Sequence, residues 1–219
     1  MKYGKFEAGK PVKKNTVPSK GGVGAEKQNE AEKISPVKNL LLYMHDFVYL
    51  LAGVLLLLML CFRVVVVSGP SMYDTLVDGD YLLLLGNVFY QDPQQGDIIV
   101  VSKDSFEDGE PIIKRVIATE GQTVDIDFEA GIVYVDGVAL VEDYTYTPTT
   151  LQEGVSFPLV VDENCIFVMG DNRNRSSDSR NPQIGLVDER EIIGKAIFVL
   201  LPGTDGGNVE ADYSRIGAL

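Results

Sequence analysis

The chain has 219 residues, 45% of them hydrophobic, and a formal net charge of −13. This length supports one folded core of ordinary size together with a membrane segment. The acidic balance argues against a nucleic-acid partner, because nucleic acids attract basic surfaces. Two cysteines and one histidine provide neither a disulfide framework nor a zinc site, so no cofactor is expected.

The first predicted element is a membrane-spanning helix over residues 40–62. This stretch of 23 residues is apolar except for His45 and Asp46, and about 20 apolar residues cross a bilayer core. Its run LLLLMLCF is apolar on every face, unlike a buried helix of a soluble protein. A cleaved signal peptide is the other interpretation, but the segment starts late and lacks an Ala-x-Ala exit site.

Charge divides across this helix and predicts its orientation. Residues 1–39 hold nine Lys and four Glu, a net charge of +5, whereas residues 63–219 carry −17. By the positive-inside rule, the N-terminus lies in the cytoplasm and residues 63–219 lie outside the cell membrane. Residues 1–39 have no periodic apolar pattern, so we expect a disordered tail, either solvated or touching anionic lipid.

Beyond the span, short apolar runs rich in Val, Ile and Phe predict a mainly β ectodomain of antiparallel sheets. The stretch LVDEREIIG is the one that could begin with a helical turn. An acidic section of about 120–163, with the tight-turn pair Asp136-Gly137, is interpreted as a β subdomain inserted between core segments 63–119 and 164–202. The alternative is one continuous sheet. Residues 203–219 are expected to form a C-terminal tail.

Ser71 lies in the turn SGPSMYDTL, a few residues after the apolar run VVVV. It is either an ordinary turn residue or a nucleophile held just outside a bilayer. The single histidine, His45, precedes the whole ectodomain, so a Ser-His-Asp triad outside the membrane is excluded. Ser71 would then need another base, and lysine can act as one when burial lowers its pKa.

The ectodomain has three lysines to choose from. Lys103 lies in a polar loop, and Lys195 could be a strand-edge residue. Lys114 lies in PIIKRVIA, where strand alternation places it on the same face as Ile112 and Val116. Because an apolar strand face rarely holds an unpaired lysine, Lys114 is either a buried base or a side chain that snorkels from an edge strand.

Residues 170–180, GDNRNRSSDSR, form a third polar segment, directly after the apolar run CIFVM. They include three Arg, two Asp and three Ser. This segment is either a surface loop or a salt-bridged scaffold in which a hydroxyl orients a lysine amine.

Together these segments resemble the bacterial type I signal peptidases (leader peptidases) of the single-span, Gram-positive-like form, over about residues 40–202. SGPSMYDTL resembles the nucleophile box, KRVIATEGQTVDI the lysine box and GDNRNRSSDSR the last box, while IIGKAIFVLLP resembles the closing strand. The resemblance implies a signal-peptidase/LexA-like β fold. It also implies a monomeric, membrane-bound serine endopeptidase that removes signal peptides from exported preproteins after an Ala-x-Ala-type site.

The resemblance also implies residue roles. Ser71 would be the nucleophile that forms an acyl-enzyme, Lys114 the general base, and Ser176 the residue that orients the lysine amine. Met72 would shape the floor beside the nucleophile. The backbone N–H of Ser71 would be one oxyanion donor, with the Gly69 N–H a candidate for the second. The structural salt bridges would come from Asp171, Arg173, Asp178 and Arg180.

Three residues depart from the family pattern: Asp74 and Glu120 stand where Pro is usual, and Gln122 where Asp is usual. They leave open a second interpretation, a non-hydrolytic signal-peptidase-like factor for surface protein or pilus assembly. A self-cleaving repressor-type Ser-Lys peptidase is a third, against which the span argues. Residues 64–67 and 98–101 are expected to line the pockets for alanine.

Overall fold

The computed structural model describes residues 36–207 and 210–219. The chain divides into two compact units, Met1–Asp46 and Phe47–Leu219. The tail predicted over residues 1–39 lies outside the described residues, except for residues 36–39, which belong to a helix.

Helix α1 runs from Pro36 to Cys61. It therefore begins four residues before the start of the predicted span and ends one residue before the end of that span. Proline suits the first turn of a helix, because that turn has no partner for its N–H group. None of the helix residues is buried, although the helix is long and apolar enough to cross a membrane. Exposed apolar side chains along the whole helix suit a membrane anchor.

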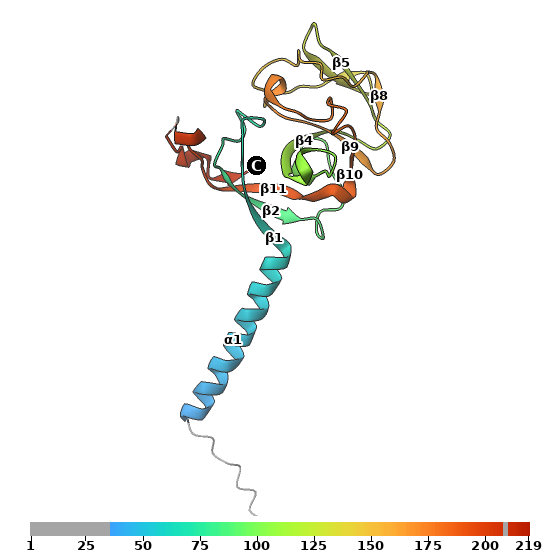
Figure 1. The fold of residues 1–219 in the computed structure, drawn as a ribbon. Coiled ribbons are helices and arrows are strands. Elements are labelled where there is room, and N and C mark those ends of the chain that lie inside the picture. Colours follow the sequence, from blue (N-terminus) through green and yellow to red (C-terminus); the bar gives the residue numbers. More distant parts are fainter. Residues whose placement is uncertain (1–35, 208–209) are drawn as a thin grey trace, which may run out of the picture. The chain divides into compact units, whose positions relative to one another are not determined.

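An eight-stranded antiparallel sheet dominates residues 62–219 (Figure 1). Its strands lie in the order β1-β2-β11-β3-β4-β9-β10, with β12 paired to β11. Their bounds are β1 Phe62–Val66, β2 Tyr81–Gly86, β3 Ile98–Ser102, β4 Pro111–Thr119, β9 Cys165–Met169, β10 Val187–Asp188, β11 Ile192–Leu201 and β12 Gly217–Ala218. Strands far apart in the sequence thus become neighbours, and β4 lies in the interior of the sheet.

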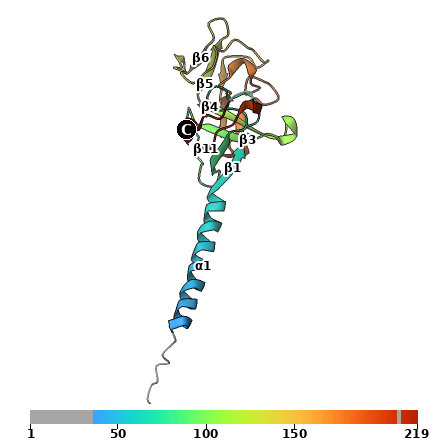
Figure 2. The same cartoon turned by 90° about the vertical axis from the view of Figure 1, so that its left-hand side faces the viewer.

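A second, four-stranded sheet lies within residues 120–163, in the order β7-β6-β5-β8. Its strands are β5 Thr123–Asp127, β6 Ile132–Val135, β7 Val138–Ala139 and β8 Leu159–Val160. Asp136 and Gly137 have φ values of 52° and 76°, as a tight hairpin turn requires. In both views this sheet lies away from β1 (Figures 1 and 2).

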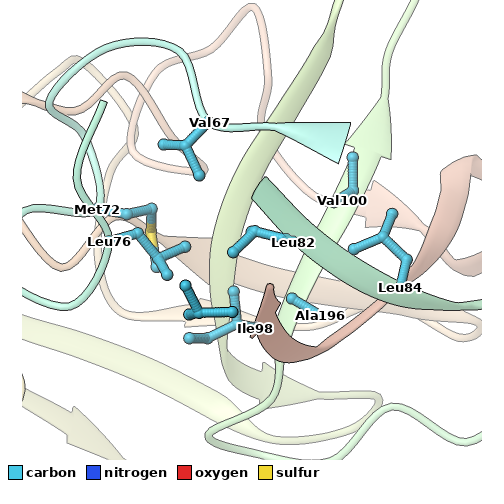
Figure 3. Packing of buried hydrophobic residues seen from close by; sticks show 9 residues of the cluster. Val67, Met72, Leu76, Leu82, Leu84, Ile98, Val100 and Ala196 are labelled. Carbon is cyan, nitrogen blue, oxygen red and sulfur yellow. The ribbon is translucent and has the colours of Figure 1, made fainter. Parts of the chain in front are cut away.

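Buried side chains form three clusters, on the two faces of the large sheet and beneath the small one. In the first, Leu82 and Leu84 of β2 pack with Met72, Leu76 and Ile98 (Figure 3). Full burial of each such side chain contributes about 1.5–3 kcal/mol to stability. The run YLLLL is therefore a core strand, with its alternate leucines buried.

Five short 3₁₀ turns connect the strands in the described part of the chain. The predicted turn in LVDEREIIG is η3, Glu189–Glu191, where Asp188 and Glu191 form a capping box. The others are η1 Glu107–Gly109, η2 Arg173–Arg175, η4 Asp205–Gly207 and η5 Tyr213–Arg215. Residues 210–219, predicted as tail, therefore contribute η5 and β12.

Candidate active site

Ser71 lies on a loop of residues 68–80, between β1 and β2, which we call the nucleophile loop after the predicted role of Ser71. Two backbone hydrogen bonds close the base of this loop: the Val67 N–H donates to the Asp80 carbonyl at 2.8 Å, and the Gly79 N–H donates to the Val67 carbonyl at 2.9 Å. Asn172 holds its tip, because its backbone N–H donates to the Ser71 carbonyl at 3.0 Å. The loop that carries Ser71 is therefore constrained at its base and at its tip.

Lys114 lies on β4, between β3 and β9. Its side chain is 3% exposed, and its Nζ is 3.1 Å from Ser71 Oγ. Nζ also donates to the Ile113 carbonyl at 2.9 Å. Because β4 is an interior strand, Lys114 does not snorkel from a sheet edge, and it lies within reach for proton transfer to and from Ser71.

Ser176 follows η2, and its side chain is buried. A Cβ added at Gly170 would lie 2.2 Å from Ser176 Oγ and 2.5 Å from the Ser71 carbonyl oxygen, so both atoms crowd the same glycine. Among the described residues, Ser176 Oγ is the buried side-chain atom with no hydrogen-bond partner. A buried hydroxyl without a partner is destabilising, which is a reason to expect a functional role for it.

The close approach at Gly170 leads to a prediction. We expect Gly170→Ala to push Ser176 and Ser71 apart, lowering both catalytic activity and the free energy of unfolding, the latter by about 1–3 kcal/mol. Thermal melts and a cleavage assay measure the two effects. Gly217→Ala is the matched control, because a Cβ there meets nothing within 4 Å. Unchanged activity in Gly170→Ala would show that this contact does not constrain the site.

A cavity of about 220 Å³ borders Ser71 and Lys114. Its walls come from the end of β1 and the nucleophile loop on one side, and from the start of β4 on the other; they include Val66, Val67, Met72, Phe106, Ile112 and Ile113. Two of the residues predicted at 64–67 therefore line it. Residues 98–101 do not, because β3 is an interior strand and buries its side chains in the clusters on both faces.

Met72 forms the floor between this cavity and the core. Its side chain is 1% exposed and packs beside Leu76 and Leu82 (Figure 3), while it also contributes to the cavity wall. Apolar packing of Met72 in the core therefore restricts the position of the loop next to Ser71.

Asp171 joins β4 to the nucleophile loop. Its carboxylate accepts two hydrogen bonds from Arg115, from Nε at 2.8 Å and from Nη2 at 2.6 Å. It also accepts one from Thr75 Oγ1 at 2.6 Å. Arg115 is the neighbour of Lys114, so one buried carboxylate ties the strand that carries the lysine to the loop that carries the serine.

Asp178 and Arg180 form a fully buried, two-point ion pair, with Nε–Oδ1 and Nη2–Oδ2 distances of 2.8 Å. Asp178 also accepts from the Gly170 N–H at 3.0 Å, and Arg180 donates to the Arg173 carbonyl at 2.6 Å. Arg173 itself pairs with Glu142. Residues 170–180 are therefore a buried, salt-bridged scaffold and not a surface loop.

Two ion-pair partners of this scaffold, Arg115 and Glu142, were not singled out from the sequence. Arg115 follows Lys114 directly, and a second cation on an apolar strand was a sign that a buried carboxylate pairs with it. The sequence around Glu142 has no feature that indicates its partner. Tyr144 stacks on Arg115 with the guanidinium carbon 4.0 Å from the ring centroid. Burial raises the pKa of Tyr144, and the charge of Glu142 adds to the effect, so the phenol stays neutral.

Comparison with known proteins identifies the family. Residues 40–201 match the family described as signal peptidase, peptidase S26. The chain belongs to this family. Probable signal peptidase I-1 of Synechocystis is 38% identical over 151 residues, 65% of this chain and 73% of that protein. Signal peptidase I of Bacillus licheniformis is 35% identical over 149 residues, 64% of this chain and 77% of that protein. A signal peptidase I structure from Enterococcus faecalis is 33% identical and covers 48% of this chain and 97% of that one, with a TM-score of 0.39.

This membership confirms the family resemblance, the mainly β fold and the enzyme class predicted from the sequence. The chain is a serine endopeptidase of the signal peptidase I class, and its apolar N-terminal helix suits a membrane-anchored enzyme. The roles of individual residues remain predictions.

Two of the departures from the family pattern stabilise turns. The Glu120 carboxylate accepts from the Asn164 N–H at 2.7 Å, and Gln122 Oε1 accepts from the Thr119 N–H at 2.9 Å. Both bonds fasten the connections between the two sheets. The third departure, Asp74, is exposed on the nucleophile loop.

The remaining candidate groups are the single histidine and the two cysteines. His45 lies on α1, 3.4 Å from Asp46, and Cys61 and Cys165 are free thiols. Over residues 36–207 and 210–219, no cluster of three or more His, Cys, Asp or Glu could hold a metal ion.

Proposed function

We propose that this chain cleaves exported preproteins after an Ala-x-Ala-type site, with Ser71 as nucleophile and Lys114 as general base. The observation that carries the proposal is the 3.1 Å separation of Ser71 Oγ from the buried Lys114 Nζ, beside a cavity that reaches the surface. A nucleophile and a base in hydrogen-bond contact are the minimum requirement for acyl transfer.

The proposed reaction has two steps. Lys114 Nζ accepts the Ser71 hydroxyl proton while Oγ attacks the scissile carbonyl carbon, and the tetrahedral intermediate collapses when the protonated lysine donates to the leaving amine. The acyl-enzyme is then hydrolysed by a water that Lys114 deprotonates in turn. The lysine must start neutral, and burial of its amine disfavours the charged form.

The developing oxyanion needs hydrogen-bond donors. We propose the Ser71 N–H as one of them. The Gly69 N–H, the candidate for the second, already donates to the Asp78 carboxylate at 2.7 Å, so its use would require that bond to break. The buried hydroxyl of Ser176 has no hydrogen-bond partner among the described residues, and we propose that it is available to orient the lysine amine.

The cavity supports specificity for small side chains. In an extended peptide, the first and third residues before the cut point to the same side, so both would enter the one cavity beside Ser71. The cavity has a volume of about 220 Å³, and Val66, Val67 and Ile113 among its lining residues would contact the two methyl groups, while Glu110 and Ser177 add polar groups to the wall. The peptide would add as a strand between the end of β1 and the start of β4.

We further propose that α1 spans the cell membrane once, with the N-terminus in the cytoplasm and residues 62–219 outside. The support is the charge difference, +5 before the span against −17 after it. Ser71, four residues after the apolar run VVVV, would meet the signal peptide where it leaves the bilayer.

A cleavage assay with the full chain in detergent tests the proposal. The substrate is a preprotein with an Ala-x-Ala site, and mass spectrometry of the product locates the cut. We expect the parent to cut after the second alanine and Ser71→Ala to release no product, while the exposed control Ser156→Ala cleaves normally. A folded parent that binds but does not cleave would favour the non-hydrolytic factor instead.

A further inference from the structure

Residues 210–219 dock on the domain, although they lie beyond the stretch that matches the family. Their strand β12 pairs with β11, and the Leu219 N–H donates to the Ile197 carbonyl at 3.2 Å. The preceding turn η5 is capped by Asp212, whose carboxylate accepts from the Ser214 N–H at 3.0 Å. The sheet and the cap together place the next residue, Arg215, at a defined position.

Arg215 contacts the nucleophile loop at two points. Its guanidinium donates to both carboxylate oxygens of Asp80, at 2.9 Å and 2.6 Å, and to the Thr75 carbonyl at 3.1 Å. Asp80 is fully buried and also accepts from the N–H groups of Val77 and Gly203, at 2.8 Å and 2.6 Å. Arg215 therefore neutralises a buried charge at the end of the loop and fixes the backbone at its middle.

The chain after β11 packs against the same part of the loop. A Cβ added at Gly203 would lie 2.2 Å from the Asp78 carbonyl oxygen and 2.6 Å from the Asp80 nitrogen. This backbone contact leaves no room for the end of the loop to move toward Gly203. Arg215 restrains a second point of the loop, because its guanidinium binds the Thr75 carbonyl.

Thr75 is the link to the chemistry. Its hydroxyl donates to Asp171, the carboxylate that binds Arg115 next to Lys114, while its carbonyl accepts from Arg215. Thr75 lies four residues after Ser71. The C-terminal segment and the strand that carries Lys114 thus hold one residue of the loop from two directions.

We propose that Arg215 is a positioning residue that sets the distance between Ser71 Oγ and Lys114 Nζ from outside the family-matched part of the chain. The inference rests on the proposed function, in which Ser71 is the nucleophile. A shift of about 1 Å at a reacting group can lower a rate on the order of 100-fold. Arg215 touches neither the cavity walls nor the dyad, so its effect should appear in kcat and not in KM.

The test compares Arg215→Ala with Arg190→Ala in the full chain. Arg190 is a matched control, because it too lies in a 3₁₀ turn and forms a two-point pair with an aspartate, Asp188, but on the exposed surface. We expect Arg215→Ala to lose kcat by about 10- to 100-fold with KM within a few-fold of the parent. Millimolar methylguanidinium should restore part of the loss, and Arg215→Lys should fall between parent and alanine variant. Arg190→Ala should match the parent and not respond to the additive.

The outcomes separate this inference from the proposed function. If the folded parent does not cleave, or Ser71→Ala still does, the proposed function fails and this inference with it. If the parent cleaves through Ser71 and Arg215→Ala retains its kcat, the positioning role alone is overturned. It is also overturned if Arg215→Ala and Arg215→Lys lose activity only in proportion to the folded fraction seen by circular dichroism, without rescue by methylguanidinium.

Discussion

Replacing Lys114 by methionine is expected to lower kcat/KM by about 10²- to 10⁴-fold, the usual contribution of a positioned general base. Methionine keeps the length and apolar character of the lysine stem in a position that is 3% exposed. The fold should therefore persist, and Tm should not fall. Single-turnover cleavage of a preprotein, with Tm measured in parallel, separates the loss of chemistry from any loss of structure.

The pH dependence of kcat/KM for the parent tests the role of the Lys114 amine. Only the unprotonated amine can accept the Ser71 proton, so kcat/KM of the parent should rise with pH until the amine is neutral and then level off. Lys103→Met, the control, should keep this rise, because the Lys103 amine binds the Leu186 carbonyl and the Glu191 carboxylate. A parent profile that is flat from weakly acidic to basic pH would exclude Lys114 as the base.

Arg180→Met is expected to lower the free energy of unfolding by about 3–5 kcal/mol, because it leaves the buried Asp178 carboxylate without its cation. Both side chains are fully buried. Arg180 also donates to the carbonyls of Leu151 and Arg173, so the substitution strands two further acceptors. We expect Asp178 to shift, and with it the Gly170 N–H that it binds.

Urea denaturation monitored by circular dichroism measures this effect. Arg190→Met is the control: its pair with Asp188 has the same geometry, but the arginine side chain is 90% exposed, so little stability should be lost. Retained stability in Arg180→Met would show that water or a neighbouring group compensates for the buried charge. Activity should fall together with stability, since Gly170 lies against Ser71 and Ser176.

Features with a local physical cause could be predicted from the sequence. An apolar run longer than a bilayer core predicts a spanning helix wherever it occurs, and α1 agrees with the prediction to within four residues at its start. Strand alternation, the Asp136-Gly137 turn and the helical turn in LVDEREIIG depend on neighbours in the sequence. The motifs around Ser71, Lys114 and residues 170–180 were sufficient for the family, which the comparison confirmed.

The partners of the buried charges were decided by the tertiary structure. Asp171 pairs with Arg115, Arg173 with Glu142 and Asp80 with Arg215, and no sequence pattern links the members of these pairs. Residues 210–219, expected as a tail, are part of the domain through the pairing of β12 with β11 and the ion pair of Arg215 with Asp80. A charge finds its partner through the register and order of strands, which bring distant segments side by side, and a buried charge must be paired. The sequence alone pointed to Ser71 and Lys114 as the residues that we propose carry the chemistry, while the folded sheet decided what holds them in place.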